Sequence, residues 1–503
     1  MKLSALMERA GLERGGAGDE TVTGFAIDHR KVAPGTVFGA FRGAQFNAED
    51  VISDAVDAGA VAVVARPEAQ VEGALHVASE EPRQTFAQLA AKFFTPVPPT
   101  IVAVTGTNGK TSTAEMMRQI WRMCGERAAS IGTLGVTTPD ESVSTGLTTP
   151  DIVTFLSNMS GLAREGVTHV AYEASSHGLS QYRNEGVAVS ACAFTNFSRD
   201  HLDYHGTMEA YFDAKMRLFD EVIEPGAPAI IWRGADSNEW SGRAIEHARN
   251  SVASVLVVGE AEEGDRDTFL RLSHRVPTQL GQTLTIEFDG KERTVKLPLI
   301  GAYQAANALC AAGLALATGA GPSQVFDAVS RLQPVRGRLE RAVITQQGAP
   351  VYIDYAHTPD ALEAAITALR PHVDADNGGR LIVVFGAGGD RDAGKRAPMG
   401  EVAARMADLA IVTDDNPRGE DPSEIRSEIM RGVSQGDARD IGDRRKAIAV
   451  AIAEAGAKDI ILVAGKGHEQ GQIIGSGDTM RVLAFDDVTV ARECAAEMGS
   501  APA

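Results

Sequence analysis

One segment of this chain carries the residue types and spacing of a phosphate-binding loop. Residues 105–112 read TGTNGKTS, after an apolar run at 101–104 that predicts a buried strand and before a periodic segment at 113–123 that predicts a helix. At such a turn, backbone N–H groups and the helix dipole bind phosphate, while a lysine adds charge and a threonine hydroxyl can bind Mg²⁺. The generic pattern has a further glycine where Val104 stands, so this loop is a variant, but an ordinary turn would not need Gly-Lys-Thr. We predict that it binds a nucleotide through Gly106, Thr107, Asn108, Gly109, Lys110, Thr111 and Ser112.

Five further polar clusters each follow a predicted strand directly. They are Glu173, Asn196, 386–391, 414–418 and 465–469. In open α/β sheets, ligands bind outside the carboxyl ends of the strands. The clusters therefore predict a ligand site between two α/β domains.

Acidic and histidine side chains near these strand ends have the chemistry to hold a metal. Glu173 ends a strand, where a hard carboxylate suits Mg²⁺, and residues 196–206 (NFSRDHLDYHG) are dense in Asp and His. Taken alone, the second segment is equally consistent with a helix N-cap and solvated polar residues. Lys215, taken alone, is a surface lysine on an amphipathic helix, with Met216 and Phe219 on neighbouring faces.

Composition narrows the class of protein. The 503 residues are 44% hydrophobic and 23% charged, enough for packed cores in about three domains at ~150 residues each. The net charge of −19 argues against a nucleic-acid protein and against adsorption to an anionic membrane. The four cysteines are far apart, which disfavours zinc fingers and a disulfide framework. We expect neither a signal peptide nor a membrane-spanning helix, because residues 1–8 are not apolar enough and no apolar run reaches ~18 residues. We expect a reduced, cytoplasmic protein.

The predicted elements indicate an α/β fold in three regions. Residues 1–98 mix short apolar runs with turns and end at the Pro-rich stretch 96–99, which is typical of a stiff connector. Residues 99–336 alternate apolar strands with helices, which predicts βαβ units and a mainly parallel sheet. Residues 337–503 alternate in the same way. Beyond 101–104, the expected strands are 167–172, 190–195, 351–354, 381–385, 409–413 and 459–463, and an Ala-rich helix is expected near 305–317.

Taken together, the motifs resemble those of the ATP-dependent Mur ligases. The resemblance covers essentially the whole chain and is strongest for the members that add the third residue to UDP-N-acetylmuramoyl-L-alanyl-D-glutamate. It implies a three-domain architecture: a UDP-sugar-binding domain at 1–98, a central P-loop ATPase-like parallel sheet at 99–336, and a Rossmann-like, amino-acid-binding domain at 337–503. Besides the phosphate loop, the matching segments are 148–150 (TTP), 173–177 (EASSH), 200–203 (DHLD), 214–219 (AKMRLF), 337–340 (GRLE) and 354–360 (DYAHTPD).

The resemblance implies a two-step, ADP-forming amide ligase of peptidoglycan precursor synthesis. The D-glutamate carboxylate of the substrate attacks the γ-phosphate of ATP, and the amine of the incoming amino acid then displaces phosphate from the acyl phosphate. In the family a central-domain lysine is carbamylated by CO₂, which turns a cation into a carboxylate that helps organise Mg²⁺, and Lys215 matches that position. The implied catalytic residues are Lys110, Lys215, His201 and Glu173, and the implied Mg²⁺ ligands are Thr111, Glu173, His201 and carbamylated Lys215.

Other substrate contacts carry over position by position. Three positions depart from the family pattern: His29 replaces a serine, Asn47 lies where an Asp-Gly pair usually follows, and Gln304 replaces the first of two asparagines. The further ATP positions are Asn307, Arg338 and Asp354. The positions for the UDP-sugar dipeptide are Ile27, His29, Ala44, Gln45, Phe46, Thr148, Thr149, Ser175, Gln181 and Arg183.

An Asp-Asn-Pro-Arg sequence at 415–418 indicates which amino acid is added. By itself it could be only a turn after a strand, but in the family it marks members that add meso-diaminopimelate rather than L-lysine. Arg418 offers a bidentate fork for the extra carboxylate of diaminopimelate, whereas lysine would leave a buried guanidinium unpaired, a difference that can discriminate by ~10⁴–10⁵. The implied contacts are Arg391, Asp415, Asn416, Pro417, Arg418, Gly465 and Glu469, the last suited to an ammonium.

Three alternatives share some of these features. A sister ligase or a folylpolyglutamate synthase would have the phosphate loop and the lysine but not 415–418. A nucleotide-gated regulator without ligase activity would bind or hydrolyse ATP regardless of any amino acid. We expect small-molecule substrates (the UDP-linked dipeptide, meso-diaminopimelate and ATP), Mg²⁺ and the lysine carbamate as cofactors, no nucleic acid, no membrane insertion and a monomer.

Overall fold

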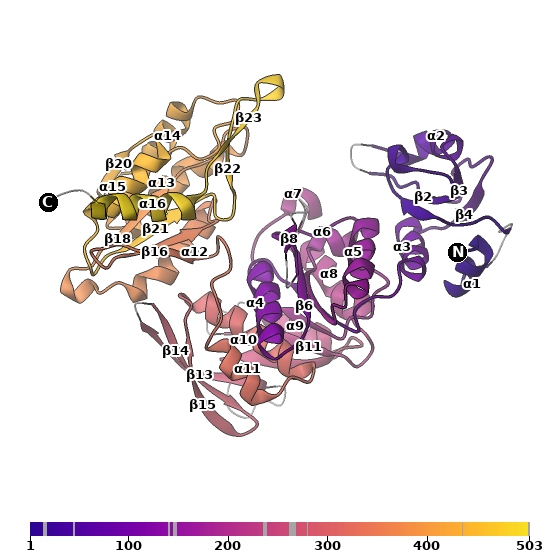
Figure 1. The fold of residues 1–503 in the computed structure, drawn as a ribbon, viewed down its shortest axis with the longest axis horizontal. Coiled ribbons are helices and arrows are strands. Elements are labelled where there is room, and N and C mark those ends of the chain that lie inside the picture. The colour runs from indigo at the N-terminus through magenta and orange to yellow at the C-terminus, as the bar shows by residue number, and fades with distance from the viewer. Residues whose placement is uncertain are drawn as a thin grey trace. The chain divides into compact units, whose positions relative to one another are not determined.

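The computed structural model describes residues 1–13, 18–43, 46–138, 141–143, 148–234, 239–260, 268–278, 280–434 and 436–500. The chain forms two compact units, the first made of Met1–Arg271 and Ala306–Ala328, the second of Leu272–Ala305 and Val329–Ala503. Figure 1 labels their helices and strands. Within the described residues, no helix combines the length and the apolar character needed to cross a membrane.

The N-terminal part of the first unit is a small parallel sheet covered by helices. Its strand order is β1-β2-β3-β4, and all three pairings are parallel. Phe25 and Phe41 lie edge-on to Phe86 of α3, which ties the sheet to that helix. The elements are α1 (Leu3–Arg9), β1 (Gly24–Ala26), β2 (Thr36–Gly39), α2 (Ile52–Asp57), β3 (Ala60–Ala65), β4 (Leu75–Ala78) and α3 (Pro82–Phe93), with 3₁₀ turns at His29–Lys31 and Ala48–Val51.

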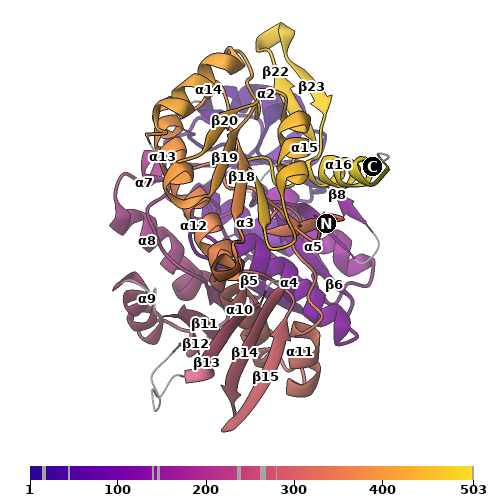
Figure 2. The same cartoon turned by 90° about the vertical axis from the view of Figure 1, so that its left-hand side faces the viewer.

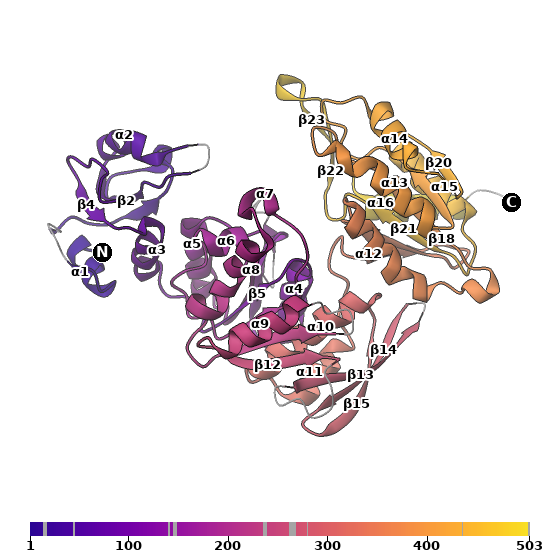
Figure 3. The same cartoon turned by 180° about the vertical axis from the view of Figure 1, so that it is seen from behind.

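The rest of the first unit is built on a larger sheet that is mainly parallel, as predicted. The strand order in this part is β12-β11-β10-β5-β9-β6-β7-β8, and the same sheet continues beyond β12 into β13, β14 and β15. Only the edge strands β7 and β8 pair antiparallel in this part. Figure 3 shows α6, α7 and α8 grouped together. The elements are β5 (Thr100–Thr105), α4 (Lys110–Met123), β6 (Ala128–Gly132), β7 (Gly135–Thr137), β8 (Ser142–Val143), α5 (Ile152–Arg164), β9 (His169–Glu173), α6 (Ser176–Ser180), β10 (Ala191–Phe194), α7 (Leu202–His205), α8 (Met208–Arg217), a π-helical turn at Leu218–Val222, β11 (Pro228–Arg233), α9 (Glu239–Arg249) and β12 (Ser254–Gly259).

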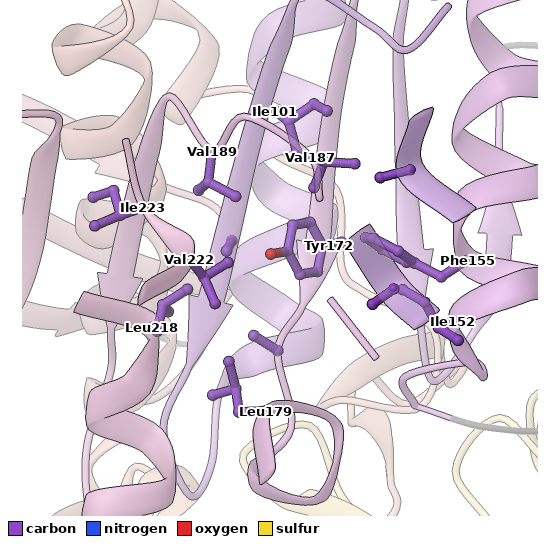
Figure 4. Close-up of a cluster of buried hydrophobic side chains, with 14 of the residues drawn as sticks. Ile101, Ile152, Phe155, Tyr172, Leu179, Val187, Val189, Leu218, Val222 and Ile223 are labelled. Atoms are coloured by element: carbon purple, nitrogen blue, oxygen red, sulfur yellow. The ribbon is translucent and has the colours of Figure 1, made fainter. Parts of the chain in front are cut away.

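One face of this sheet buries a continuous apolar cluster. Figure 4 shows Tyr172 of β9 at its centre, with Phe155 of α5 on one side and Val222 and Ile223 on the other. The rings of Phe155 and Tyr172 meet edge to face with centroids 5.1 Å apart. Burial of such large side chains, at ~25 cal/mol per Å² of apolar surface, holds the carboxyl end of β9 and its last residue, Glu173, in place.

The second unit is a doubly wound α/β sheet preceded by an antiparallel hairpin. Its strand order is β16-β17-β21-β18-β19-β20, parallel except for β16. Helices α12, α13 and α14 cover one face and α15 and α16 the other (Figure 2). The elements are β13 (Thr268–Thr278), which begins in the first unit, β14 (Gly281–Phe288), β15 (Lys291–Leu297), β16 (Glu340–Ile344), β17 (Pro350–Asp354), α12 (Pro359–Leu369), β18 (Leu381–Phe385), α13 (Arg396–Met406), β19 (Leu409–Val412), α14 (Pro422–Arg431), β20 (Ala438–Asp440), α15 (Arg444–Glu454), β21 (Ile460–Ala464), β22 (Gly471–Ile474), β23 (Arg481–Ala484) and α16 (Asp487–Ser500), with 3₁₀ turns at Arg370–His372, Ala375–Asn377, Ala393–Lys395 and Gly477–Thr479. Two further helices, α10 (Ala302–Ala317) and α11 (Pro322–Val329), cross the unit boundary.

Candidate active site

The loop between β5 and α4 has the geometry of a phosphate cradle. Gly106 and Gly109 have φ of 141° and 85°, conformations that favour glycine, and α4 begins immediately afterwards. Lys110 Nζ donates to the carbonyls of Gly106 (3.0 Å) and Thr107 (2.7 Å), so its ammonium lies over the loop. The first turn of a helix has N–H groups without partners inside the helix, and such a helix start together with this ammonium suits an anion.

Thr111 and Glu173, two of the predicted metal ligands, lie in contact. Thr111 Oγ1 donates to Glu173 Oε2 at 2.9 Å, and the backbone N–H of Thr133 donates to Oε1 at 2.7 Å. Glu173 is 2% exposed, and its carboxylate occupies the space left by the missing side chain of Gly132. A cavity of about 10 Å³, lined in part by Thr111 and Glu173, adjoins them. A buried carboxylate beside a threonine hydroxyl is the oxygen donor set that Mg²⁺ prefers, so these two residues fit the metal.

Lys215 is fully buried, not on the surface as its position on an amphipathic helix alone predicted. Its Nζ donates to the carbonyl of Gly106 at 2.7 Å and lies 4.5 Å from the ring centroid of Tyr211. Burial, and next the charge of Lys110, lowers the pKa of Lys215 well below its ordinary value. Nowhere in the described part of the chain does a carboxylate form an ion pair with it. In general, the neutral form of an amine is the one that can add CO₂.

His201 lies at the start of α7, with a left-handed backbone (φ 51°) and a half-exposed side chain. Its ring meets those of His177 (centroids 4.8 Å apart) and Tyr211 (5.9 Å) and its Nε2 is 3.5 Å from Asp200. Among the residues that the structure describes, no group of three or more His, Cys, Asp or Glu side chains could hold a metal by itself. Of the four predicted metal ligands, Thr111 contacts Glu173, whereas Lys215 and His201 both contact the ring of Tyr211.

Four of the predicted substrate-side residues form one hydrogen-bonded chain. Thr149 Oγ1 donates to Ser175 Oγ (2.9 Å) and to the carbonyl of Glu173 (2.8 Å), and Arg183 Nη1 donates to the carbonyl of Thr149 (3.1 Å). Arg183 Nη2 also donates to Gln181 Oε1 at 2.7 Å. Thr148 joins a neighbouring group, with its Oγ1 3.1 Å from that of Thr133. These residues are therefore held rigidly at the carboxyl end of β9.

The other residues predicted to contact the UDP-sugar dipeptide belong to the N-terminal part of the first unit. The rings of His29 and Phe46 stack with centroids 6.4 Å apart, and Ile27 packs against the core. Arg30 bonds to Asp28 and lowers the pKa of that carboxyl to about 2. Ala44 and Gln45, also predicted here, lie outside the described residues.

The remaining ATP positions are divided between the two units. Asn307, on α10 in the first unit, has its Oδ1 3.4 Å from Thr113 Oγ1. Arg338 and Asp354 belong to the second unit, where Asp354 accepts from the backbone N–H of Leu339 at 2.8 Å. Gln304 is 1% exposed and donates to the carbonyl of Arg338 at 2.9 Å, so this departure from the family pattern has a structural role.

The predicted amino-acid contacts form a second buried group, in the second unit. Asn416 Nδ2 donates to Glu469 Oε2 at 2.8 Å, and the backbone N–H of Ile473 in β22 donates to Asn416 Oδ1 at 2.9 Å. Asp415 is buried and its Oδ2 has no hydrogen-bond partner among the described residues. Arg418 donates to the carbonyl of Gly389 at 2.9 Å but has no ion pair with any carboxylate of the described ranges. Among the described residues, this loop therefore carries a carboxylate oxygen without a hydrogen bond and a guanidinium without an ion pair, which together suit a ligand that carries both charges.

Three other predicted residues surround this group. Gly465 has φ 119°, and a Cβ there would come 2.5 Å from Asp415 Oδ2, so only glycine leaves room for that carboxylate. Pro417 is buried in the same loop. Arg391 is exposed, with a single long bond to the carbonyl of Asp390 (3.5 Å).

Sequence reasoning missed two residues that organise these groups. Tyr211, fully buried, donates from its hydroxyl to Thr107 Oγ1 at 3.2 Å and places its ring under Lys215. Its spacing of four residues before Lys215 on a helix was the available signal. Lys466, 0% exposed, donates to Asn416 Oδ1 at 2.8 Å. Its position between two glycines after a strand gave no sign of burial.

Comparison with known proteins identifies the class. The family model for the Mur ligase middle domain matches residues 104–315, and that for the Mur ligase glutamate ligase domain matches 337–467. The chain belongs to the Mur ligase family, which consists of ATP-dependent, ADP-forming amide ligases.

Individual relatives share one name. The UDP-N-acetylmuramoyl-L-alanyl-D-glutamate--2,6-diaminopimelate ligases of Zymomonas mobilis and Bradyrhizobium diazoefficiens are 58% and 49% identical, over 94% and 93% of this chain and 95% and 93% of theirs. A solved structure of a ligase of that name has 32% identity and a TM-score of 0.72, covering 95% of this chain and 96% of its own. A folylpolyglutamate synthase of Mycobacterium tuberculosis, at 20% identity and a TM-score of 0.60 over 76% of this chain and 92% of its own, shares the fold.

Proposed function

We propose that this protein is the ligase that adds meso-diaminopimelate to UDP-N-acetylmuramoyl-L-alanyl-D-glutamate in peptidoglycan precursor synthesis. The observation that carries the proposal is the group in the second unit. After one strand, and counting only the described residues, Arg418 has no ion pair and Asp415 Oδ2 has no hydrogen bond. The far end of diaminopimelate carries a carboxylate and an ammonium, which match these two groups in charge. L-lysine has only the ammonium and would leave Arg418 without a partner.

In the first step the chain's own residues position ATP and neutralise charge. The loop amides and Lys110 bind the phosphates, and they stabilise the charge that develops as the substrate carboxylate attacks the γ-phosphorus and ADP leaves. Thr149, Ser175 and Arg183 orient the UDP-linked dipeptide so that this carboxylate lies in line. The amine of diaminopimelate then attacks the acyl phosphate, the C–O bond to phosphate breaks, and an amide and inorganic phosphate are released.

We propose that Thr111, Glu173, His201 and carbamylated Lys215 hold Mg²⁺ in this reaction. The metal supplies Lewis-acid stabilisation of phosphoryl oxygens when it is bound. The buried amine of Lys215 supports carbamylation, because a neutral amine adds CO₂ and the resulting carbamate no longer repels a cation. Activity should collapse in Lys215→Ala, and bicarbonate should not restore it. A carbamate ¹³C NMR signal from ¹³C-bicarbonate, present in the wild type and absent in the variant, reads out the modification independently of turnover.

We further propose that the three regions 1–98, 99–336 and 337–503 bind the UDP-sugar, ATP and the amino acid in that order. The family-model matches, which begin near the second and third regions, support this division. We also propose that the reaction takes place in the cytoplasm and that the protein acts as a monomer.

The decisive experiment measures phosphate release with ATP, Mg²⁺ and the UDP-linked dipeptide, in parallel with meso-diaminopimelate, L-lysine or no amino acid. Release only with diaminopimelate, matched by a UDP-tripeptide product, is the expected result. Arg418→Ala should lose most turnover with diaminopimelate while the KM for ATP stays unchanged, and Arg431→Ala, an exposed arginine of the same unit, is the control. Release that is indifferent to the amino acid would reject the ligase proposal and indicate a nucleotide-driven regulator.

A further inference from the structure

Lys466 is a fully buried cation at the centre of the amino-acid group, and no predicted contact includes it. It lies on the loop after β21 between Gly465 (φ 119°) and Gly467 (φ 53°). A Cβ on Gly467 would come 2.6 Å from Cβ of Tyr355, so this tight loop can form only with glycine there. The two glycines turn the loop so that the lysine side chain points inward, where it is 0% exposed.

The hydrogen bonds of Lys466 determine how the Asn416 side chain is oriented. Lys466 Nζ donates to Asn416 Oδ1 at 2.8 Å, and the N–H of Ile473 donates to the same oxygen. Because two donors hold the oxygen, the amide nitrogen must point the other way, where it donates to Glu469 Oε2. The same carboxylate oxygen is 3.5 Å from Lys466 Nζ. One ammonium thus orients two of the predicted amino-acid contacts.

The charges around the group give Lys466 a second role. Asp415 and Glu469 are both carboxylates, whereas the far end of diaminopimelate offers a single ammonium. Arg444 Nη1 is 4.0 Å from Asp415 Oδ2, but its guanidinium already pairs with buried Asp487 at 2.7 Å. Lys466, in contrast, forms an ion pair with Glu469 and, within the described residues, with no other carboxylate.

We propose that Lys466 is a positioning and specificity-determining residue. It holds Asn416 and Glu469 in place and cancels one of the two carboxylate charges. The amino-acid group then accepts an end group with one ammonium and one carboxylate. This inference rests on the proposed function and deepens it. Without Lys466 the amino-acid group has one more uncompensated negative charge. A purely cationic end group, such as that of L-lysine, then competes better with that of diaminopimelate.

Two variants separate the hydrogen bond from the charge. Lys466→Gln keeps a donor near Asn416 Oδ1 but removes the charge, whereas Lys466→Met removes both at similar volume. We expect the KM for diaminopimelate to rise about tenfold or more in Lys466→Met and less in Lys466→Gln, because only Lys466→Met leaves the buried oxygen of Asn416 without this donor. In both variants the ratio of kcat/KM for diaminopimelate to that for L-lysine should fall about tenfold or more. The KM for ATP should stay within about twofold of the wild-type value, because the effect is confined to the amino-acid group.

The controls keep the outcomes distinct. Lys458→Met replaces an exposed lysine of the same unit and should change none of these values. A wild type that does not use diaminopimelate would overturn the proposed function, whatever Lys466 does. A wild type that uses diaminopimelate, with an unchanged discrimination ratio in both folded Lys466 variants, would overturn this inference alone. If Lys466→Met does not fold, Lys466→Gln still decides the role of the charge.

Discussion

Gly132 offers a direct test of whether the Glu173 carboxylate must lie where the structure has it. A Cβ on Gly132 would come 2.6 Å from Cδ and 2.7 Å from Cγ of Glu173, and carbon atoms in ordinary contact are ~3.5–4.0 Å apart. Gly132→Ala must therefore displace the carboxyl group by about 1 Å. Gly132 is not among the glycines with positive φ, so the effect of the substitution is steric and not conformational.

The displacement acts on two hydrogen bonds. Those from Thr133 N (2.7 Å) and Thr111 Oγ1 (2.9 Å) would both lengthen, and hydrogen bonds to a charged group contribute about 1.5–3 kcal/mol each. A misplacement of ~1 Å at a reacting centre can cost about 10²-fold in rate. We therefore expect Gly132→Ala to lower kcat for phosphate release about 100-fold and to lower the melting temperature.

The matched control is Gly161→Ala. Gly161 lies within α5, and a Cβ there would meet nothing within 4 Å. A helical Gly→Ala change without strain stabilises by about 0.4–1 kcal/mol, so this variant should keep its activity and melt slightly higher. If Gly132→Ala stays folded and its kcat falls less than about threefold, the position of Glu173 does not matter for turnover and the reasoning is refuted.

Two other predictions concern stability. Asp487→Asn leaves the buried charge of Arg444 without its partner at 2.7 Å, which should cost about 3–5 kcal/mol of stability. Calorimetry should show a lower melting temperature for the second unit. An unchanged melting temperature would mean that the pair is solvated. His372 is buried, which lowers its pKa, and its Nε2 accepts from the backbone N–H of Gly301 at 3.3 Å, so its neutral form is favoured. Because the folded pKa lies below that of the unfolded chain, this stabilisation is present above about pH 6.5 and is lost as the pH falls through the folded pKa. Melting curves from pH 8 to 5 should therefore fall less steeply in His372→Gln than in the wild type, and parallel curves would contradict the assignment.

The strands were predictable from the sequence where an apolar run is short, buried and bounded by turns. The run 381–385 is β18 without any shift, and 101–104 is β5 with one more residue at each end. Both lie in the middle of a parallel sheet, where every side chain is buried and the pattern is continuous. The hairpin β14–β15 was not predicted, because its alternating, partly exposed residues give a weaker signal.

The buried charges were not predictable in the same way. Glu115 and Arg118 are three residues apart on α4, a spacing that alone indicates a solvated pair on a helix face. Both are less than 9% exposed in the structure. Ser130, on the distant strand β6, lies beside them and donates to Glu115 at 2.9 Å. Lys466 is a comparable case. Burial of a charge depends on what a distant segment places over it, and neighbours in the sequence do not contain that information.

Lys215 and Lys466 show how the same side chain, buried to the same extent, is suited to opposite roles. Lys215 has a carbonyl, that of Gly106, as its hydrogen-bond partner and a second cation, Lys110, nearby, so its neighbours do not compensate the loss of hydration and its pKa falls well below the ordinary value. Burial also lowers the pKa of Lys466, but the charges of Asp415 and of Glu469, whose carboxylate is 3.5 Å away, partly offset that lowering. The first setting favours the neutral amine, which can react with CO₂, whereas the carboxylates in the second setting favour the ammonium, which can serve as a counter-ion. If the two proposals are correct, exchanging these neighbours, and not the lysines themselves, would exchange their chemistry.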